Sequence, residues 1–385
     1  MGDETMRTRG GLLGELVVML LSTSFSCHPK GVVALMYLEI ITRYMKFAQE
    51  DNQYIPMVLA AFLDKRGIRH PNIHVSRRAC YLFMRVVKVL KAKLVPFVET
   101  IVQNLKDTTA RFTNLDYTLK ELSGSEDGSH IFEPREMVSF LVLLNQLICK
   151  FRKLFHDILE EVYPTIVGRI FSIIPRDTFP SGPGTNTEEI RELQELQRIL
   201  YTFLHVIATH DLSSIFLSPK SRGYLDPMLQ LLLCSACDHK DILVRKASVQ
   251  IFNRLMKDWC VKPHDEDKVP GFRSFMIEAF AINCCLYSVL DKSFEFRDAN
   301  ALALFGEIVM AQKVMFEKFG DDFLAHFVSK GFPTAHCPQD LVELYCQKLQ
   351  GSDIKALRSF YQSLIENLRL QPNGSVVFRW QCRHR

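Results

Sequence analysis

The chain has 385 residues, of which 48% are hydrophobic and 23% are charged, a composition that excludes a largely disordered chain and is ample for a large folded core. The formal net charge is only +4, which excludes a strongly basic, histone-like binder, so any affinity for nucleic acid must come from clustered charge. The eleven cysteines are scattered and odd in number, which favours reduced thiols in a cytosolic or nuclear protein over a disulfide framework.

Helical periodicity recurs along almost the whole chain, and no segment alternates as a strand would. The first apolar run follows Arg7 and Arg9 and is similar to a signal peptide, but Glu15 interrupts it, which argues against secretion. The predicted helices cover residues 10–26, 30–48, 54–65, 72–92, 95–106, 135–155, 158–173, 188–209, 224–236, 240–258, 271–289, 294–318, 321–329, 338–349 and 353–368. Flexible breaks, each rich in Gly, Pro, Ser or acidic residues, are predicted at 123–130, 175–189 and 262–271.

Prolines recur near the starts of these helices with a spacing typical of helical repeats. Pro56 and Pro96 are 40 residues apart, and Pro227 and Pro270 are 43 residues apart. Proline suits the first turn of a helix, where its missing N–H costs nothing, and HEAT-type helix pairs repeat every ~40 to 47 residues. The period therefore indicates a tandem array of helix pairs.

A short motif also occurs twice, as VSRRA at residues 75–79 and as VRKA at residues 244–247. In the order that a HEAT repeat uses, the apolar residue anchors the core, the small Ala lets two helices approach, and the basic residues lie at the solvent edge. Together with the proline period, the motif predicts an all-α fold, a HEAT-repeat α-solenoid built as a superhelical array of antiparallel helix pairs. Such solenoids present a long concave surface suited to large partners, so binding is the expected function.

The segment RRACYLFMRVVKVLKAK, residues 77–93, carries basic residues throughout an apolar run. This excludes a membrane span, which needs roughly 20 apolar residues with few charges. On a helix, Leu82, Phe83 and Val86 gather on one side and the basic residues on the other. The sequence predicts an amphipathic helix whose basic side is either an ordinary solvated surface or a surface that binds a ligand.

Sequence patterns for catalysis or metal binding are missing. Cys234, Cys237 and His239 invite a zinc interpretation, but a structural zinc site needs four ligands, and no second pair lies at a suitable spacing, so buried thiols are favoured. The sequence has no GxSxG nucleophile elbow, no GxxxxGKS/T phosphate loop and no HExxH motif. It therefore predicts a protein that is not an enzyme and has no cofactor and no metal site.

One long stretch is similar to a known family. IPMVLAAFLDKRGIRHPNIHVSRRACYLFMRVVKVL at residues 55–90, continuing through KLVPFVETIVQNLKD, resembles the exportin-T family, tRNA exportins of the karyopherin-β (importin-β) class, in its plant form. The resemblance spans roughly residues 10–370 and includes YLEIITRYMKF, EPREMVSFLVLLNQLICKF and DILVRKASVQIFNRLMKDW. It implies a tRNA nuclear export receptor, a HEAT solenoid that binds folded tRNA on a concave basic surface together with the GTP-bound small GTPase Ran. It also implies contacts with nuclear pore proteins, no membrane insertion, and shuttling between nucleus and cytoplasm.

Such a carrier needs Lys and Arg side chains directed at phosphates and spread over an extended surface. The RNA-binding candidates are Arg77, Arg78, Arg85, Lys88, Lys91, Lys93, Lys240, Arg245, Lys246, Arg254 and Lys257. Arg66 and Arg69 are further candidates, for which a turn between helices is an equally good account. For every one of these residues the alternative is an ordinary solvated helix face.

The sequence departs from the family pattern in three places. It begins inside the solenoid, without the N-terminal repeats that typically bind Ran, so the Ran site is expected to be incomplete. Several helices are missing between Glu133 and Pro134, which predicts a deletion junction, and the end from Trp380 is unlike the family. The predicted organisation is HEAT-like repeats at 1–122, a flexible segment with the junction at 123–134, repeats at 135–174, a flexible loop at 175–187, C-terminal repeats at 188–369 and a divergent tail at 370–385.

Two other functions stay open on the residues alone. One is a generic HEAT-repeat scaffold that binds proteins without RNA cargo, and the other is an enzyme-associated regulatory subunit. Binding of folded tRNA that depends steeply on salt would favour transport, whereas salt-insensitive binding of a protein would favour the scaffold.

Overall fold

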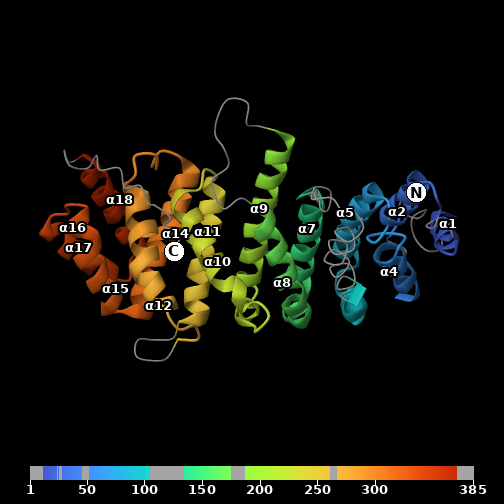
Figure 1. Cartoon of the computed structure of the whole chain (residues 1–385), viewed down its shortest axis with the longest axis horizontal. Coiled ribbons are helices and arrows are strands. Elements are labelled where there is room, and N and C mark those ends of the chain that lie inside the picture. The colour runs from blue at the N-terminus through green and yellow to red at the C-terminus, as the bar shows by residue number, and fades with distance from the viewer. Residues whose placement is uncertain are drawn as a thin grey trace, which may run out of the picture. The chain divides into compact units, whose positions relative to one another are not determined.

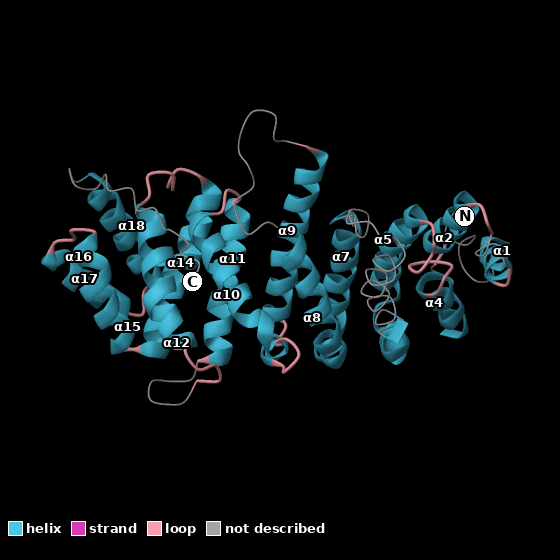
Figure 2. Ribbon diagram, viewed as in Figure 1, coloured by secondary structure: helices cyan, strands magenta, loops and turns pink. Residues whose placement is uncertain are grey.

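The computed structural model of the chain describes residues 12–23, 25, 28–45, 52–101, 103, 104, 134–174, 187–260 and 267–370. Every regular element among these residues is a helix (Figure 2), which confirms the all-α prediction. Apart from residues 134, 187 and 370, the predicted deletion junction, flexible loop and divergent tail lie outside the described residues.

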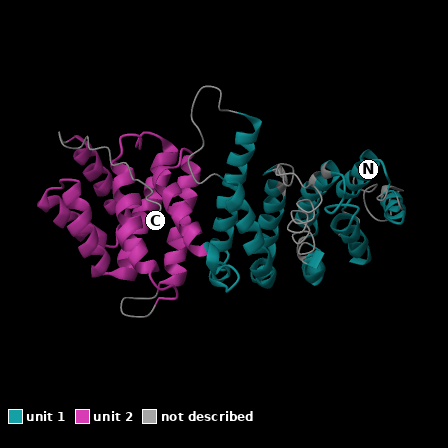
Figure 3. Ribbon diagram, viewed as in Figure 1, with its two compact units in different colours: residues 1–224 teal, residues 225–385 magenta. Residues whose placement is uncertain are grey.

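The chain forms two compact units, residues 1–224 and 225–385 (Figure 3). The α-helices of the first unit are α1 (Leu12–Leu21), α2 (Gly31–Arg43), α4 (Ile55–Leu63), α5 (Ile73–Leu90), α7 (Pro134–Phe151), α8 (His156–Ile173) and α9 (Glu188–Thr209) (Figure 1). Its short 3-10 helices are η3 (Asn52–Tyr54), η4 (Lys91–Phe97), η5 (Arg152–Phe155), η6 (Ser213–Leu217) and η7 (Arg222–Tyr224). Within this unit α2 packs on α5, α5 on α7 and α7 on α9. Packing between near neighbours along the chain is the arrangement of an α-solenoid.

The second unit continues with shorter and less regular elements. Its α-helices are α10 (Leu225–Asp238), α11 (Ile242–Trp259), α12 (Phe272–Phe275), α13 (Ser288–Leu290), α14 (Ala299–Phe319), α15 (Asp321–His326), α16 (Phe332–Thr334), α17 (Gln339–Gln350) and α18 (Ile354–Leu370). Its π-helical turns are η8 (Met276–Phe280), η9 (Asn283–Tyr287) and η10 (Phe327–Gly331). Here α10 packs on α11, α11 on α14 and α17 on α18, so the predicted α-solenoid class is confirmed in this unit as well.

Each unit has its own apolar core, to which the helices contribute buried stripes. In the first unit, Phe62 of α4 and Phe83 of α5 lie with ring centroids 5.8 Å apart. In the second unit, Tyr361 of α18 stacks on Phe305 of α14 at 5.7 Å, and its hydroxyl donates to the carbonyl oxygen of Cys285 at 2.6 Å. Because Cys285 lies in a π-helical turn, where the regular backbone ladder is displaced, this hydrogen bond helps to satisfy the local backbone.

Proline and capping side chains mark several helix starts. Pro56 is the second residue of α4 and Pro227 is the third residue of α10, so both lie in a first turn as predicted. Asp241 caps α11 and Asp298 caps α14 through their side chains. These local signals explain where these helices begin.

Replacing Asp241 with Ala is expected to lower the free energy of unfolding by about 1 kcal/mol. Its Oδ1 accepts a hydrogen bond from the N–H of Leu243 at 2.9 Å, and its charge also favours a helix N-terminus. Urea unfolding followed by circular dichroism measures the loss. Asp238→Ala removes an exposed carboxylate three positions earlier and serves as the matched control, and equal losses in both variants would contradict the capping role.

Several predicted helix boundaries are wrong; the helices predicted over 10–26 and 30–48, for example, end at Leu21 and Arg43. Two further errors have a clear local cause. The helix predicted over 135–155 stops before Arg152, whose φ of 45° is followed by a 3-10 turn; a non-glycine residue rarely adopts this left-handed conformation, and an α-helix does not continue through it. The helix predicted over 294–318 begins only at Ala299, where Asp298 caps it. In both cases the apolar periodicity extends past a local backbone signal that ends or starts the helix.

Among the described residues of the second unit, two helical stretches are long and apolar enough to cross a membrane by length and composition alone. They are Phe272–Leu290 and Ala299–Phe319, and the most apolar 18 residues of each are 61% and 50% buried inside the protein. Helices that pass this test while packed against neighbouring helices are typical of a protein core. We therefore interpret both as core helices of the second unit.

Candidate nucleic-acid interface

The exposed side of α5 carries a basic stripe, which we define as Arg78, Tyr81, Arg85 and Lys88. Successive members are three or four positions apart, so they lie along one side of the helix, and all of them are exposed. Leu82, Phe83 and Val86 point into the core and are 0% exposed. The predicted amphipathic helix is confirmed. Since α5 contains no acidic residue, its solvent-exposed side is cationic.

Arg78 is held in place by neighbours on two helices. Its Nε donates to Oε1 of Glu39 on α2 at 2.6 Å, and its Nη2 forms an ion pair with the same carboxylate. Its guanidinium also lies 4.8 Å from the ring centroid of Tyr81, a cation–π contact. The charge of Arg78 is therefore partly neutralised within the fold.

Arg85 and Lys88 differ from Arg78 in this respect. Both are exposed, and neither has a hydrogen-bond or ion-pair partner within the part of the chain that the structure describes. Lys93, in η4, is half-buried and has an interaction within the fold. The side chains of the two other predicted cations of this segment, Arg77 and Lys91, lie outside the described residues. Of the cations of α5 whose side chains the structure describes, Arg85 and Lys88 are thus the best placed for a phosphate.

The second motif helix, α11, has a different register from the first. Aligning Val244 with Val75 places Ser248, not Ala247, opposite the buried Ala79, and Ser248 is also 0% exposed. The VRKA motif is one residue shorter than VSRRA, which rotates its basic residues by about 100° around the helix. The residue after the valine therefore faces inward.

Arg245 is the predicted candidate that this rotation removes from the surface. It is only 8% exposed, its Nε donates to the carbonyl oxygen of Ala236 at 3.3 Å, and its guanidinium lies 5.5 Å from the ring centroid of Phe294. Ser76 occupies the equivalent place on α5 and donates to the carbonyl oxygen of Ile68. The prediction that Arg245 lies at the solvent edge is wrong, because the side chain bonds a carbonyl near the end of the preceding helix.

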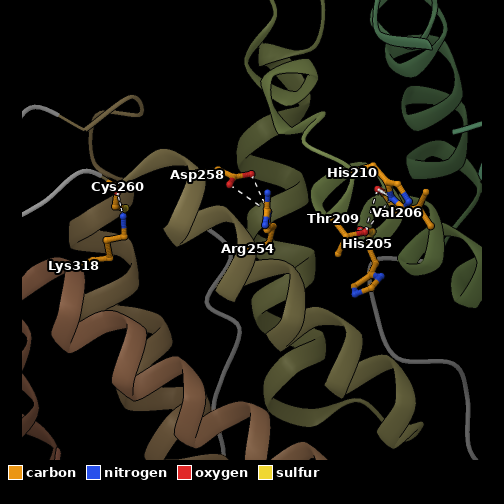
Figure 4. Close-up of polar contacts among 8 residues, drawn as sticks. All are labelled: His205, Val206, Thr209, His210, Arg254, Asp258, Cys260 and Lys318. Atoms are coloured by element: carbon orange, nitrogen blue, oxygen red, sulfur yellow. Dashed lines mark hydrogen bonds and ion pairs between the residues drawn. The ribbon is translucent and has the colours of Figure 1, made fainter. Parts of the chain in front are cut away.

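The remaining candidates of the second unit are distributed unevenly. Lys240 and Lys257 are exposed and Lys246 is half-buried. Arg254 forms an ion pair with Asp258, one turn further along α11, at 3.2 Å (Figure 4). Contacts within the fold therefore compensate more of the positive charge of this set than of Arg85 and Lys88.

Other basic side chains donate to carbonyl oxygens at helix ends, a use that sequence reasoning missed. Nζ of Lys318 lies 2.9 Å from the carbonyl oxygen of Cys260, just after α11 (Figure 4). Nζ of Lys313 lies 2.9 Å from that of Leu349 in the last turn of α17. A cation near a helix C-terminus is favoured by the helix dipole. The partners are 58 and 36 residues distant in sequence, so no local pattern signals them.

Figure 4 also shows the side-chain contacts that cap the C-terminal end of α9 in the first unit. The Thr209 hydroxyl donates to the carbonyl oxygen of His205 at 2.8 Å, and Nδ1 of His210 lies 2.9 Å from the carbonyl oxygen of Val206. Both contacts add a side-chain donor to carbonyls in the last turn, and the Val206 carbonyl also accepts the backbone N–H of His210 at 3.2 Å. The imidazole of His210 therefore has a structural role at this helix end.

The DKRGIRH segment forms the turn between α4 and α5. Nε of Arg66 donates to Oδ2 of Asp64 at 2.7 Å, and Nε of Arg69 donates to the carbonyl oxygen of Leu63 at 3.1 Å. Both arginines thus stabilise the turn, which favours the structural alternative that the sequence left open for them.

One constellation of the first unit is similar to a hydrolytic triad. His156 Nε2 lies 3.1 Å from the Ser214 hydroxyl, and its Nδ1 lies 3.2 Å from a carboxylate oxygen of Asp157. However, the Asp157 side chain is 98% exposed, so water competes for it and it cannot hold the imidazole as a buried triad carboxylate does. We interpret the group as a link between the start of α8 and η6.

The cysteines of the CxxC motif are free thiols, and Cys237 is buried while Cys234 is half-buried. Burial raises the pKa of Cys237 well above its usual value, because a buried thiolate would lose its hydration. Cys237 is thus a buried thiol as predicted, whereas Cys234 is only partly buried.

Comparison with known proteins identifies the family. A family model described as Exportin-T matches residues 3–111 and 127–369. Exportin-T of Arabidopsis thaliana is 50% identical over 517 aligned positions, which cover 98% of this chain and 52% of that protein. Exportin-T of Oryza sativa subsp. japonica is 41% identical over 98% of this chain and 53% of that protein. Exportin-T of Homo sapiens is 18% identical over 94% of this chain and 51% of that protein.

The chain spans about half the length of the curated relatives it matches. The alignment with the Arabidopsis protein is longer than the chain, 517 positions against 385 residues, so the matched part of that relative contains residues that have no counterpart here. A missing internal block is what the sequence predicts, and its place at residues 133 and 134 stays a prediction. The family model covers most of this chain, and a plant relative is 50% identical to it over 98% of this chain's residues. This chain therefore belongs to the exportin-T family.

Proposed function

We propose that this chain acts as a tRNA nuclear export receptor. The observation that carries the proposal is its 50% identity with the Arabidopsis Exportin-T over 98% of its residues. In this proposal the chain binds folded tRNA together with GTP-bound Ran, contacts nuclear pore proteins and shuttles between nucleus and cytoplasm, without catalysing a reaction.

The basic stripe of α5 supports the RNA part of the proposal. Arg85 and Lys88 extend into solvent from a helix whose other side is fixed in the core, so the backbone positions that carry them are set without any ligand. Phosphates that they neutralise release counterions, which drives association at low salt. Folded RNA is recognised largely through its shape and backbone, and an exposed cationic helix face suits that kind of recognition better than a pocket would.

The proposal is tested by titrating the purified chain with folded tRNA at two salt concentrations, with and without GTP-loaded Ran. We expect binding that weakens steeply as salt rises and tightens when GTP-loaded Ran is present. Salt-sensitive binding that ignores Ran would retain the RNA part of the proposal and remove the Ran part. No binding at either salt concentration would contradict the proposal.

A second candidate function is a scaffold for a protein partner, and the exposed side of α2 favours it. Val32, Met36 and Ile40 follow one another at four-residue intervals and are 67%, 59% and 36% exposed. An apolar stripe of this kind on a surface is typical of interaction sites. Binding of a protein at this stripe would be lost in a Met36→Ser variant and would depend little on salt. Binding of tRNA at α5 would be unaffected by that uncharged change.

A further inference from the structure

We propose that Glu39 limits the RNA affinity of the basic stripe by holding Arg78. The inference rests on the proposed RNA binding by α5 and adds a residue that controls it. Glu39 lies on α2 and Arg78 on α5, two helices that pack together. The restraint therefore links the stripe to the neighbouring helix.

The contact between these residues is direct and lies at the surface. Nε of Arg78 is 2.6 Å from Oε1 of Glu39, and the two side chains remain 46% and 38% exposed. An anionic ligand can therefore reach the guanidinium, but only by competing with a carboxylate that is already in place. Among the cations of the stripe, Arg78 is the one for which the described residues supply such a competitor.

An exposed ion pair of this kind is weak, which makes it a restraint and not a block. Surface pairs contribute about 0–1 kcal/mol to stability, so a phosphate can displace Glu39. The exchange replaces one anion by another at Arg78. It therefore adds less binding free energy than a phosphate gains at a cation that has no partner. Arg85 and Lys88 then supply most of the binding, while Arg78 adds only a small part.

Tyr81 keeps Arg78 on the stripe when the carboxylate is removed. The guanidinium carbon lies 4.8 Å from the ring centroid, and such cation–π contacts hold a guanidinium over an aromatic ring without neutralising its charge. Removal of the Glu39 charge should therefore leave Arg78 close to its present place and available to a phosphate.

The test compares the unchanged chain with a Glu39→Gln variant in binding folded tRNA over a range of salt concentrations. Glutamine keeps the size of the side chain and removes its charge. We expect Glu39→Gln to tighten binding about threefold at low salt and to steepen the dependence of log affinity on log salt by about 0.7 to 0.9, the value for one additional phosphate contact. Adding Arg78→Ala to this variant should abolish the gain.

Two matched variants separate this effect from others. Glu99→Gln changes the net charge equally at another exposed carboxylate of the first unit, and an equal gain there would overturn the proposal by assigning the effect to overall charge. The Glu39→Gln/Arg78→Ala double variant should bind within about twofold of the unchanged chain, because the two charges compensate each other, and a loss as large as that of Arg85→Ala would overturn the proposal too.

The failure of the restraint is distinguishable from the failure of RNA binding itself. If the unchanged chain binds tRNA in a salt-sensitive way but Glu39→Gln binds with the same affinity, the restraint is wrong and the proposed function stands. If the unchanged chain and Glu39→Gln both fail to bind at low salt, the proposed function and the restraint are overturned together.

Discussion

Replacing Arg85 and Lys88 together with Ala is expected to weaken the binding of folded tRNA about tenfold at low salt. Each exposed charge that meets a phosphate is assigned about 0.7 kcal/mol, within the range for exposed ion pairs, and about 1.4 kcal/mol corresponds to a factor of ten in affinity. The slope of log affinity against log salt should fall by about 1.4 to 1.8, the value for two phosphate contacts. A fluorescence titration over several salt concentrations measures both quantities.

The fold should survive this change, because both side chains are exposed and Ala is the strongest helix former. The matched control is the pair Lys153→Ala and Lys220→Ala, which removes two exposed cations of the same unit that do not lie on α5. If both double variants lose the same affinity, overall charge and not the basic stripe determines binding, and the assignment of the site is contradicted.

Replacing Gly67 with Ala is expected to lower the free energy of unfolding by about 2–3 kcal/mol, the cost of forcing an extra methyl group into a closely packed place. A Cβ at this position would lie 2.2 Å from the carbonyl oxygen of Phe62. That oxygen cannot move away freely, because it accepts a hydrogen bond from the N–H of Ile68 at 2.7 Å. The turn between α4 and α5 must therefore open, and the start of the helix that carries the basic stripe shifts with it.

The effect of this variant is read from the midpoint of urea unfolding, followed by circular dichroism. Gly223→Ala is the control, because a Cβ there would meet no atom within 4 Å, and it should leave the midpoint nearly unchanged. A Gly67→Ala variant as stable as the control would show that the turn adjusts at little cost. It would also remove our physical explanation for the glycine in the DKRGIRH segment.

Helix periodicity predicts most of this fold because each long helix buries one continuous apolar stripe. The clearest case is α5, where the spacing of Leu82, Phe83 and Val86 predicts the buried side and hence the exposed one. The prediction is wrong where a single residue decides the boundary, as at Arg152 with its φ of 45°. Backbone conformation at one position leaves no trace in a pattern that is read over ten or more residues.

The candidate site is less predictable, because the fate of a charge depends on groups distant in sequence. Arg78 and Arg85 look equivalent on α5, yet only Arg78 has the carboxylate of Glu39, 39 residues away, within hydrogen-bond distance. Arg245 resembles Arg78 by motif but is buried, since the one-residue difference in spacing turns it toward the core. Which basic residues are exposed and unpaired can therefore be decided only once the packing of neighbouring helices is known.

The central claim is that α5 contacts RNA, and ultraviolet crosslinking of the chain to folded tRNA at low salt tests it most directly. Mass spectrometry then identifies the crosslinked peptides. We expect crosslinks within residues 73–93, including Tyr81, which is 45% exposed and lies among the cations of the stripe. Efficient crosslinking that is confined to peptides outside this segment would show that tRNA binds elsewhere, and it would contradict the account.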